Sequence, residues 1–231
     1  MNLEGKLVAV TGAFGTLGTA VVRATQAAGA RVAAIDRAAA LHHADALGEA
    51  LLFGGVDLAD EKAAADALGK VAQALGGLDA LVNIAGAFRW ETVADGSLDT
   101  WDLLYRINLR TAAAASKAAL PHLRKSGSGR IVNIGAAASA KAGAGMGAYA
   151  ASKAGVARLT EALAEELKDD RITVNAVLPS IIDTPPNRAE MPQAEFDRWV
   201  KPEQLADVIV FLLSDRAAAI TGALLPVVGR V

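Results

Sequence analysis

The chain has 231 residues, of which 53% are hydrophobic and 21% charged, and it contains no cysteine. These values exclude a disordered chain, disulfides, thiolate metal sites and cysteine nucleophiles. The 23 Lys and Arg nearly balance the 25 Asp and Glu, which argues against nucleic acid or an anionic membrane as a partner. The sequence has neither a run of about 18 apolar residues nor a signal-peptide pattern, so we expect a cytoplasmic protein.

Apolar segments alternate with helical patterns along the chain. The predicted strands cover residues 7–10, 31–36, 51–56, 78–84, 130–135, 172–178 and 223–228. The predicted helices cover residues 15–28, 60–75, 97–125, 148–168 and 202–213, with a weaker helix over 38–50. Strands that alternate with helices form βαβ units with right-handed crossovers. We therefore predict one α/β domain over residues 1–231, with a seven-stranded, mainly parallel sheet and helices on both faces.

Residues 179–201 are the one irregular segment of the predicted chain. Prolines interrupt it repeatedly, and aromatic and polar residues are mixed within it. Long excursions in compact domains are often lids over a site. We therefore expect Met191, Phe196 and Trp199 to form apolar walls against a small-molecule substrate.

A glycine-rich turn follows the first predicted strand and opens the first predicted helix. Glycines there let the backbone turn tightly and approach a pyrophosphate, whose charge is met by N–H groups at the helix N-terminus. Such a turn can be purely structural, but its position in a βαβ unit favours a dinucleotide site. The residues expected to hold the cofactor are Gly12, Phe14, Gly15, Thr16, Leu17 and Gly18.

Asp36 ends the second predicted strand, where a carboxylate can accept both hydroxyls of an adenosine ribose. Its charge would repel a 2′-phosphate, so it favours NAD(H) over NADP(H), although the neighbouring Arg37 weakens that exclusion. A solvated Asp at a strand end is the alternative. Arg37 is also expected to contact the cofactor. Asp57 and Leu58 follow the third predicted strand and are candidates for contact with the adenine, with a helix N-cap as the alternative role of Asp57.

Tyr149 and Lys153 stand four residues apart, on one face of a predicted helix. A phenol with a pKa of about 10 is a weak acid–base group at neutral pH, and a neighbouring ammonium would favour its phenolate. A surface pair with this spacing is common. Together with the glycine-rich turn, however, the pair indicates catalysis.

Further motifs extend this pattern over the whole chain. They are Leu81-Val82-Asn83-Ile84-Ala85-Gly86, Ile107-Asn108-Leu109, Val174-Asn175-Ala176-Val177-Leu178-Pro179 and Asp183-Thr184-Pro185. With these motifs the chain resembles the short-chain dehydrogenase/reductase family, which implies a doubly wound Rossmann domain. The resemblance implies that Tyr149 donates a proton, that Lys153 binds the nicotinamide ribose and lowers the pKa of Tyr149, and that Asn108 holds a relay water. It also implies cofactor contacts at Asn83, Ala85, Gly86, Pro179, Ile182 and Thr184, and a homodimer or homotetramer built on the helices 97–125 and 148–168.

The chain departs from the family pattern at Ala136, where the family usually has the Ser that polarises a substrate carbonyl. Ser139 is three residues out of register, and Thr16 and Ser180 replace family glycines. Two alternatives to a typical member are therefore open: a carbonyl reductase that lacks its Ser, and a silent NAD-binding sensor or scaffold.

A second resemblance gives this loss a meaning. Dihydropteridine reductases also have Ala in place of the Ser, and their loop is similar to the segment from Leu178 to Trp199. Phe88 falls near the place where that subgroup has an aromatic residue beside the pterin. The resemblance implies hydride transfer from NADH to a quinonoid dihydropterin or a similar conjugated acceptor. No metal is expected, because His42 and His43 lack a third ligand at metal spacing.

Overall fold

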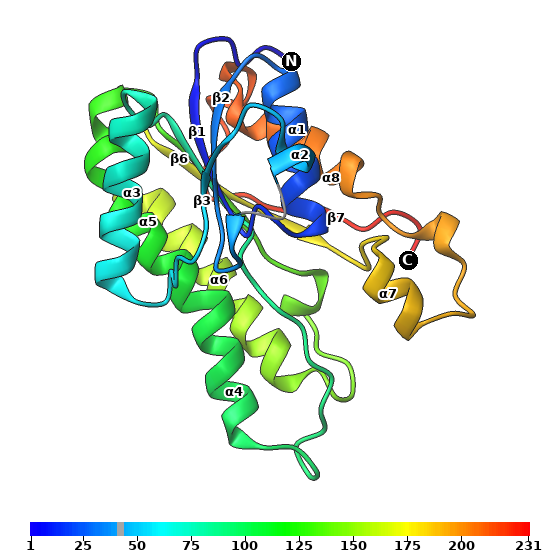
Figure 1. Cartoon of the computed structure of the whole chain (residues 1–231). Coiled ribbons are helices and arrows are strands. Elements are labelled where there is room, and N and C mark those ends of the chain that lie inside the picture. Colours follow the sequence, from blue (N-terminus) through cyan, green and yellow to red (C-terminus); the bar gives the residue numbers. More distant parts are fainter. Residues whose placement is uncertain (41–43) are drawn as a thin grey trace.

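The computed structural model describes residues 1–40 and 44–231. His42 and His43, and the middle of the predicted helix 38–50, lie outside the described residues. A sheet in the order β3-β2-β1-β4-β5-β6-β7 forms the centre of the molecule, and helices cover both of its faces (Figure 1). All of its strand pairs are parallel. The predicted seven-stranded α/β fold is confirmed.

The strands are β1 (Leu7–Thr11), β2 (Arg31–Ile35), β3 (Leu51–Phe53), β4 (Ala80–Asn83), β5 (Arg130–Ile134), β6 (Thr173–Pro179) and β7 (Leu224–Val227). The α-helices are α1 (Thr16–Ala27), α2 (Ala44–Leu47), α3 (Glu61–Leu75), α4 (Leu98–Leu104), α5 (Thr111–Ser126), α6 (Gly147–Glu166), α7 (Pro185–Glu190) and α8 (Pro202–Leu213). Four shorter turns complete the description: the π-helix η2 (Tyr105–Arg110) and the 3-10 helices η3 (Ala137–Ser139), η4 (Phe196–Arg198) and η5 (Asp215–Ala217).

Strand β1 shows why this sequence forms a two-sided core. Val8 and Val10 pack into the hydrophobic cluster under α1 and α8, whereas Ala9 packs into the cluster under α3 and α5. Alternate residues of a strand point to opposite faces of a sheet. A continuous apolar run is therefore what a strand covered on both sides requires.

Three local predictions need correction. The predicted helix 97–125 is continuous but contains the π-turn η2, which the apolar periodicity does not reveal. The predicted strand 51–56 ends at Phe53, because Gly54 and Gly55 turn the chain and Gly55 has φ +75°. The irregular segment 179–201 contains the short helix α7, which Thr184 caps by accepting from Asn187 N–H.

The strand order reverses between β1 and β4, and the loops after these two strands line a cleft at this point. Gly12 has φ +63°, and a Cβ on it would lie 2.7 Å from Ala85 N. The turn after β1 therefore lies directly against the loop after β4, an approach that only glycine allows.

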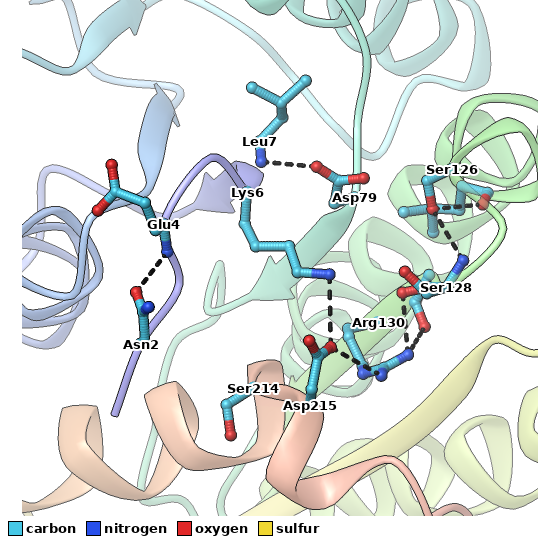
Figure 2. Close-up of polar contacts among 12 residues, drawn as sticks. Asn2, Glu4, Lys6, Leu7, Asp79, Ser126, Ser128, Arg130, Ser214 and Asp215 are labelled. Carbon is cyan, nitrogen blue, oxygen red and sulfur yellow. Dashed lines mark hydrogen bonds and ion pairs between the residues drawn. The ribbon is translucent and has the colours of Figure 1, made fainter.

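Charged side chains close the opposite end of the sheet, where the strands begin (Figure 2). Asp215 lies 3.4 Å from Lys6 Nζ and 3.6 Å from the guanidinium of Arg130, and Asp79 accepts from Leu7 N–H at 2.8 Å. These contacts join the starts of β1 and β5 to the turn after α8. Charged side chains therefore close the side of the sheet where the strands begin, and the cleft lies on the side where the strands end.

Candidate active site

A cleft of about 600 Å³ opens at the carboxyl ends of β1, β2 and β4. Thirteen of the predicted cofactor residues line it: Gly12, Phe14, Gly15, Thr16, Leu17, Gly18, Asp36, Arg37, Asp57, Leu58, Ala85, Gly86 and Thr184. The fold thus brings the glycine-rich turn, the ends of two further strands and the start of α7 to one cavity.

Asp36 is fixed at the rim of the cleft by two backbone groups. Its Oδ2 accepts from Phe14 N–H at 3.0 Å, and its Oδ1 accepts from Ala38 N–H at 3.1 Å. The carboxylate therefore stands over the glycine-rich turn instead of extending into solvent. Its position is determined by the packing of β2 beside β1.

The first turn of α1 faces the same cleft. Its N-cap is Gly15, which has no side chain to accept from the N–H groups of the helix. Gly15 is exposed, and a Cβ there would meet only Gly12 O, at 3.6 Å. Uncapped N–H groups at a helix N-terminus are a site for a phosphate. The residues present therefore fit a dinucleotide, with its pyrophosphate at this turn and its adenosine ribose at Asp36.

Asp57 pairs with a residue that the sequence analysis missed. Its Oδ2 accepts from Arg106 Nη2 at 2.7 Å, and both residues line the cleft. The alternative N-cap role is wrong, because α3 begins at Glu61 and its cap is Asp60, which accepts from Ala63 N–H at 2.8 Å. Arg106 lies in the π-turn and carried no motif that could have revealed it.

Asn83 does not line the cleft. Its amide donates to Ser116 Oγ at 3.1 Å and to Asn133 Oδ1 at 2.9 Å, and Asn133 in turn donates to Thr160. These buried bonds tie β4 and β5 to α5 and α6 beneath the site. Asn83 thus supports the helices beneath the site, and its cofactor contact stays a prediction.

Tyr149 and Lys153 lie on the first two turns of α6, and Lys153 is 5% exposed. The ring of Phe88 meets the ring of Tyr149 edge-on, with the centroids 4.9 Å apart. The Nζ of Lys153 donates to Ile134 O, at the end of β5, at 2.7 Å. Lys153 therefore reaches the sheet, and Phe88, a predicted substrate residue, packs against the ring of Tyr149.

The pKa of Tyr149 moves opposite to the expected direction. Burial raises the pKa of Tyr149 to about 12 and lowers the pKa of Lys153 to about 8. Loss of hydration on burial causes both shifts, so this structure does not show the expected lowering of the Tyr149 pKa by the Lys153 ammonium. Tyr149 therefore keeps its proton throughout the physiological range.

Asn108 lies in the π-turn and is 1% exposed. Its Oδ1 accepts from Ala87 N–H at 2.7 Å, and its Nδ2 donates to Ala87 O at 3.0 Å. A Cβ on Gly86 would lie 2.8 Å from Asn108 Oδ1 and 3.3 Å from Lys153 Nζ. Gly86 and Ala87 line the cleft, so Asn108 and Lys153 lie directly behind its wall, and Tyr149 precedes Lys153 by one turn of α6.

Ala136 is buried at 3% exposure and has an extended backbone, just before the turn η3. Ser139 N–H donates to Ala136 O at 3.0 Å, so the two residues lie at opposite ends of one tight turn. Ala136 therefore occupies the buried position before this turn, and Ser139 lies at the end of the turn.

The segment after β6 is anchored by stacked side chains. Arg188 makes two bonds to Asp183, at 2.5 and 2.8 Å, and stands 4.7 Å from the centroid of the Phe196 ring. Phe196 packs on Trp199, with centroids 4.9 Å apart. Trp199 is only 5% exposed, so it anchors the segment and presents no surface to a substrate, contrary to the prediction.

Three further predicted residues, Pro179, Ile182 and Met191, lie in or near the segment after β6. Pro179 is buried at the end of β6, and Ile182 O accepts from Asn187 Nδ2 at 2.8 Å. Met191 follows α7 and is half-buried.

Among the described residues no group of three or more His, Asp or Glu is placed to hold a metal. Within the same residues, no helix is long and apolar enough to cross a membrane.

The cleft, the glycine-rich turn and the tyrosine–lysine helix define a nucleotide-dependent oxidoreductase of the Rossmann type. A family model described as short chain dehydrogenase matches residues 6–195, so the chain belongs to that family. It is 37% identical to a 3-oxoacyl-(acyl-carrier-protein) reductase of Pseudomonas aeruginosa, over 99% of this chain and 98% of that protein.

Solved structures agree. A short-chain type dehydrogenase/reductase from Mycobacterium ulcerans has a TM-score of 0.92 at 25% identity and covers 100% of this chain and 90% of its own. A double mutant of a Serratia marcescens short-chain dehydrogenase/reductase has a TM-score of 0.89 at 31% identity, covering 100% of this chain and 99% of its own. A dihydropteridine reductase is not among these relatives, so membership of that subgroup is not shown.

Proposed function

We propose that the protein uses NADH to reduce a small conjugated acceptor, with Tyr149 as the proton donor. The observation that carries this proposal is the position of Asn108 and Lys153 directly behind Gly86, in the wall of the cleft that Asp36 also lines, with Tyr149 one turn earlier on α6. When bound, the nicotinamide supplies the hydride. The chain binds the cofactor, orients it and delivers the proton.

The chain's own contribution starts with the phenol. Tyr149 holds its proton because burial raises its pKa to about 12. Lys153, with Ile134 O as its acceptor, is placed to bind the nicotinamide ribose, and Asn108 Oδ1 faces the same point above Gly86. Phe88 excludes water from one side of the Tyr149 ring.

NADH preference follows from Asp36. A ribose hydroxyl would gain an acceptor there, whereas a 2′-phosphate would meet a fixed carboxylate. Each effect contributes on the order of 1–3 kcal/mol. Equal affinity for NADH and NADPH in titration calorimetry would overturn the preference.

The kind of acceptor follows from Ala136. A hydroxyl donor at this position would stabilise a developing alkoxide, and loss of such a donor typically costs about 100- to 1,000-fold in rate. The chain is therefore suited to acceptors that spread negative charge, such as a quinonoid dihydropterin. Phe88 and Phe196, both incompletely buried, and Met191 would flank a flat ring.

The test is a panel of acceptors assayed with NADH: quinonoid dihydropterin, β-ketoesters and simple ketones. We expect the dihydropterin to be reduced fastest, and Ala136→Ser to help ketones more than the dihydropterin. Efficient reduction of ketones by the wild type, with no reaction of the dihydropterin, would contradict this choice of acceptor.

A second candidate is general carbonyl reduction, which the similarity to a 3-oxoacyl-(acyl-carrier-protein) reductase favours. It would require Ser139 or a water to take over the role of the absent hydroxyl. The silent sensor is a weaker rival, and steady NADH oxidation with any acceptor of the panel would end it.

Assembly and location complete the proposal. We expect a homodimer or homotetramer formed through α4, α5 and α6. Leu98 and Trp101 on α4 and Tyr105 at the start of η2 leave apolar surface exposed there. Interfaces of this kind bury upwards of about 2,000 Å². A monomer in light scattering at micromolar concentration would refute it. Cell fractionation tests the expected cytoplasmic location.

A further inference from the structure

Ser152 lies one residue before Lys153 on α6, and it is only 4% exposed. Its hydroxyl donates to Tyr149 O, three residues earlier, at 2.7 Å. A serine hydroxyl has a single proton, so this bond leaves the oxygen of Ser152 as an acceptor only. Asn108 Nδ2 donates to that oxygen at 2.9 Å.

The amide of Asn108 is thereby held in one orientation. Its oxygen must face Ala87 N–H, and its nitrogen must face both Ala87 O and Ser152 Oγ. Reversing the amide would place its N–H groups against Ala87 N–H and would leave Ser152 without a donor. Only in the observed orientation does each of these three hydrogen bonds pair a donor with an acceptor.

The bond also joins two elements that the site needs in register. Asn108 lies on η2, whereas Tyr149 and Lys153 lie on α6. Within the described part of the chain, the bond from Asn108 to Ser152 is the one side-chain hydrogen bond between these two elements. A π-turn gives up regular backbone hydrogen bonding, so its geometry depends on such contacts.

We propose that Ser152 is a positioning residue for the reaction: it holds the amide of Asn108 against the turn of α6 that carries Tyr149 and Lys153. The inference rests on the proposed function. Alanine is the better helix former, so the hydroxyl is not needed to form α6. A hydroxyl buried to this degree would be unfavourable unless both of its bonds were made.

Ser214 provides a matched control. It is 2% exposed, and its hydroxyl donates to Phe211 O, also three residues earlier, at 2.7 Å. It lies at the opposite edge of the sheet, beside Asp215 and Arg130 (Figure 2). Ser214→Ala therefore removes the same kind of bond at the same depth, but far from Asn108.

The experiment is a double-mutant cycle in NADH oxidation, with kcat, KM for NADH and Tm measured for each variant. We expect Ser152→Ala to lower kcat about 5- to 10-fold, the effect of one buried hydrogen bond, with KM for NADH within about twofold of wild type. The double variant with Asn108→Ala should match Asn108→Ala alone, because Ser152 acts through Asn108. Ser214→Ala should keep the wild-type kcat. If Ser152→Ala does not fold, Ser152→Cys fills the same space with a weakly bonding thiol and should show the same fall.

Wild-type kcat in a folded Ser152 variant would overturn the inference. So would a double variant whose loss is the product of the two single losses, or an equal fall in Ser214→Ala. The proposed function fails on a different observation, namely wild-type turnover in Tyr149→Phe, whatever Ser152→Ala does.

Discussion

Phe88 meets Tyr149 edge-on, at an interplanar angle of 84° and a centroid distance of 4.9 Å. This T-shaped arrangement is favourable for aromatic rings and brings the loop after β4 over the first turns of α6. The loop after β4 thus covers the phenol of a helix that begins some sixty positions later in the sequence. The loss of hydration raises the pKa of Tyr149 to about 12.

We expect Tyr149→Phe to lower turnover about 100-fold or more, because it removes the proton donor. The ring contact with Phe88 would remain, so the NADH dissociation constant from calorimetry should be nearly unchanged. Tyr105→Phe is the control, since Tyr105 is 54% exposed. Near-wild-type turnover in Tyr149→Phe would show that another group supplies the proton.

We expect Asp36→Asn to raise affinity for NADPH relative to NADH by roughly 10- to 100-fold, because repulsion of the phosphate is lost. The asparagine also keeps just one of the two oxygens that accept from Phe14 and Ala38 N–H. Calorimetric titration with both cofactors measures the ratio. Asp95→Asn, on an exposed loop, should leave it unchanged, and an unchanged ratio in Asp36→Asn would show that preference is set elsewhere.

Lys153 makes stability depend on pH. Its pKa is lowered from 10.5 to about 8 by burial, so between about pH 8 and 10.5 the unfolded chain binds more protons than the folded one. Stability from this group therefore rises with pH across that window. Compared with Lys153→Met, the wild type should gain on the order of 3 kcal/mol of unfolding free energy between these limits.

Urea unfolding at several pH values measures this difference. A wild-type curve that runs parallel to that of Lys153→Met would contradict the lowered pKa. Tyr149 acts in the opposite direction only above about pH 10, where its raised pKa makes the folded state bind more protons. The two groups are therefore separable by pH.

Asp215 is the counter-charge of Arg130 at the end of the sheet where the strands begin, opposite the cleft. The side chain of Arg130 is 6% exposed, its Nε has no hydrogen-bond partner, and its one carboxylate neighbour in the described part of the chain is Asp215. Asp215→Asn should lower the unfolding free energy by about 1–2 kcal/mol, because a buried guanidinium loses its counter-charge. Activity at saturating cofactor should not change.

Chemical denaturation checks this prediction, with Asp66→Asn as control. Asp66 pairs with Lys62 at 2.7 Å on the surface, where an ion pair contributes little. Equal stabilities of Asp215→Asn and Asp66→Asn would show that Arg130 does not need its counter-charge.

Local patterns in the sequence were sufficient for several features, because their physics is local. The apolar run Leu7 to Val10 predicts a strand covered on both faces, and the glycines that follow predict a tight turn into α1. The spacing of Tyr149 and Lys153 places both on one helix face whatever that helix packs against. The order of strands and helices then leaves a parallel sheet as the arrangement that buries both faces.

Tertiary structure decided what depends on segments distant in the sequence. Burial by Phe88 and the sheet reversed the expected shift of the Tyr149 pKa, and packing under Phe196 buried Trp199. The π-turn that contains Asn108 was not predicted, and the amide of Asn108 contacts Ala87 and Ser152, which are distant in the sequence. Solvation and hydrogen bonding depend on neighbours in space, and the chain brings those neighbours together only by folding.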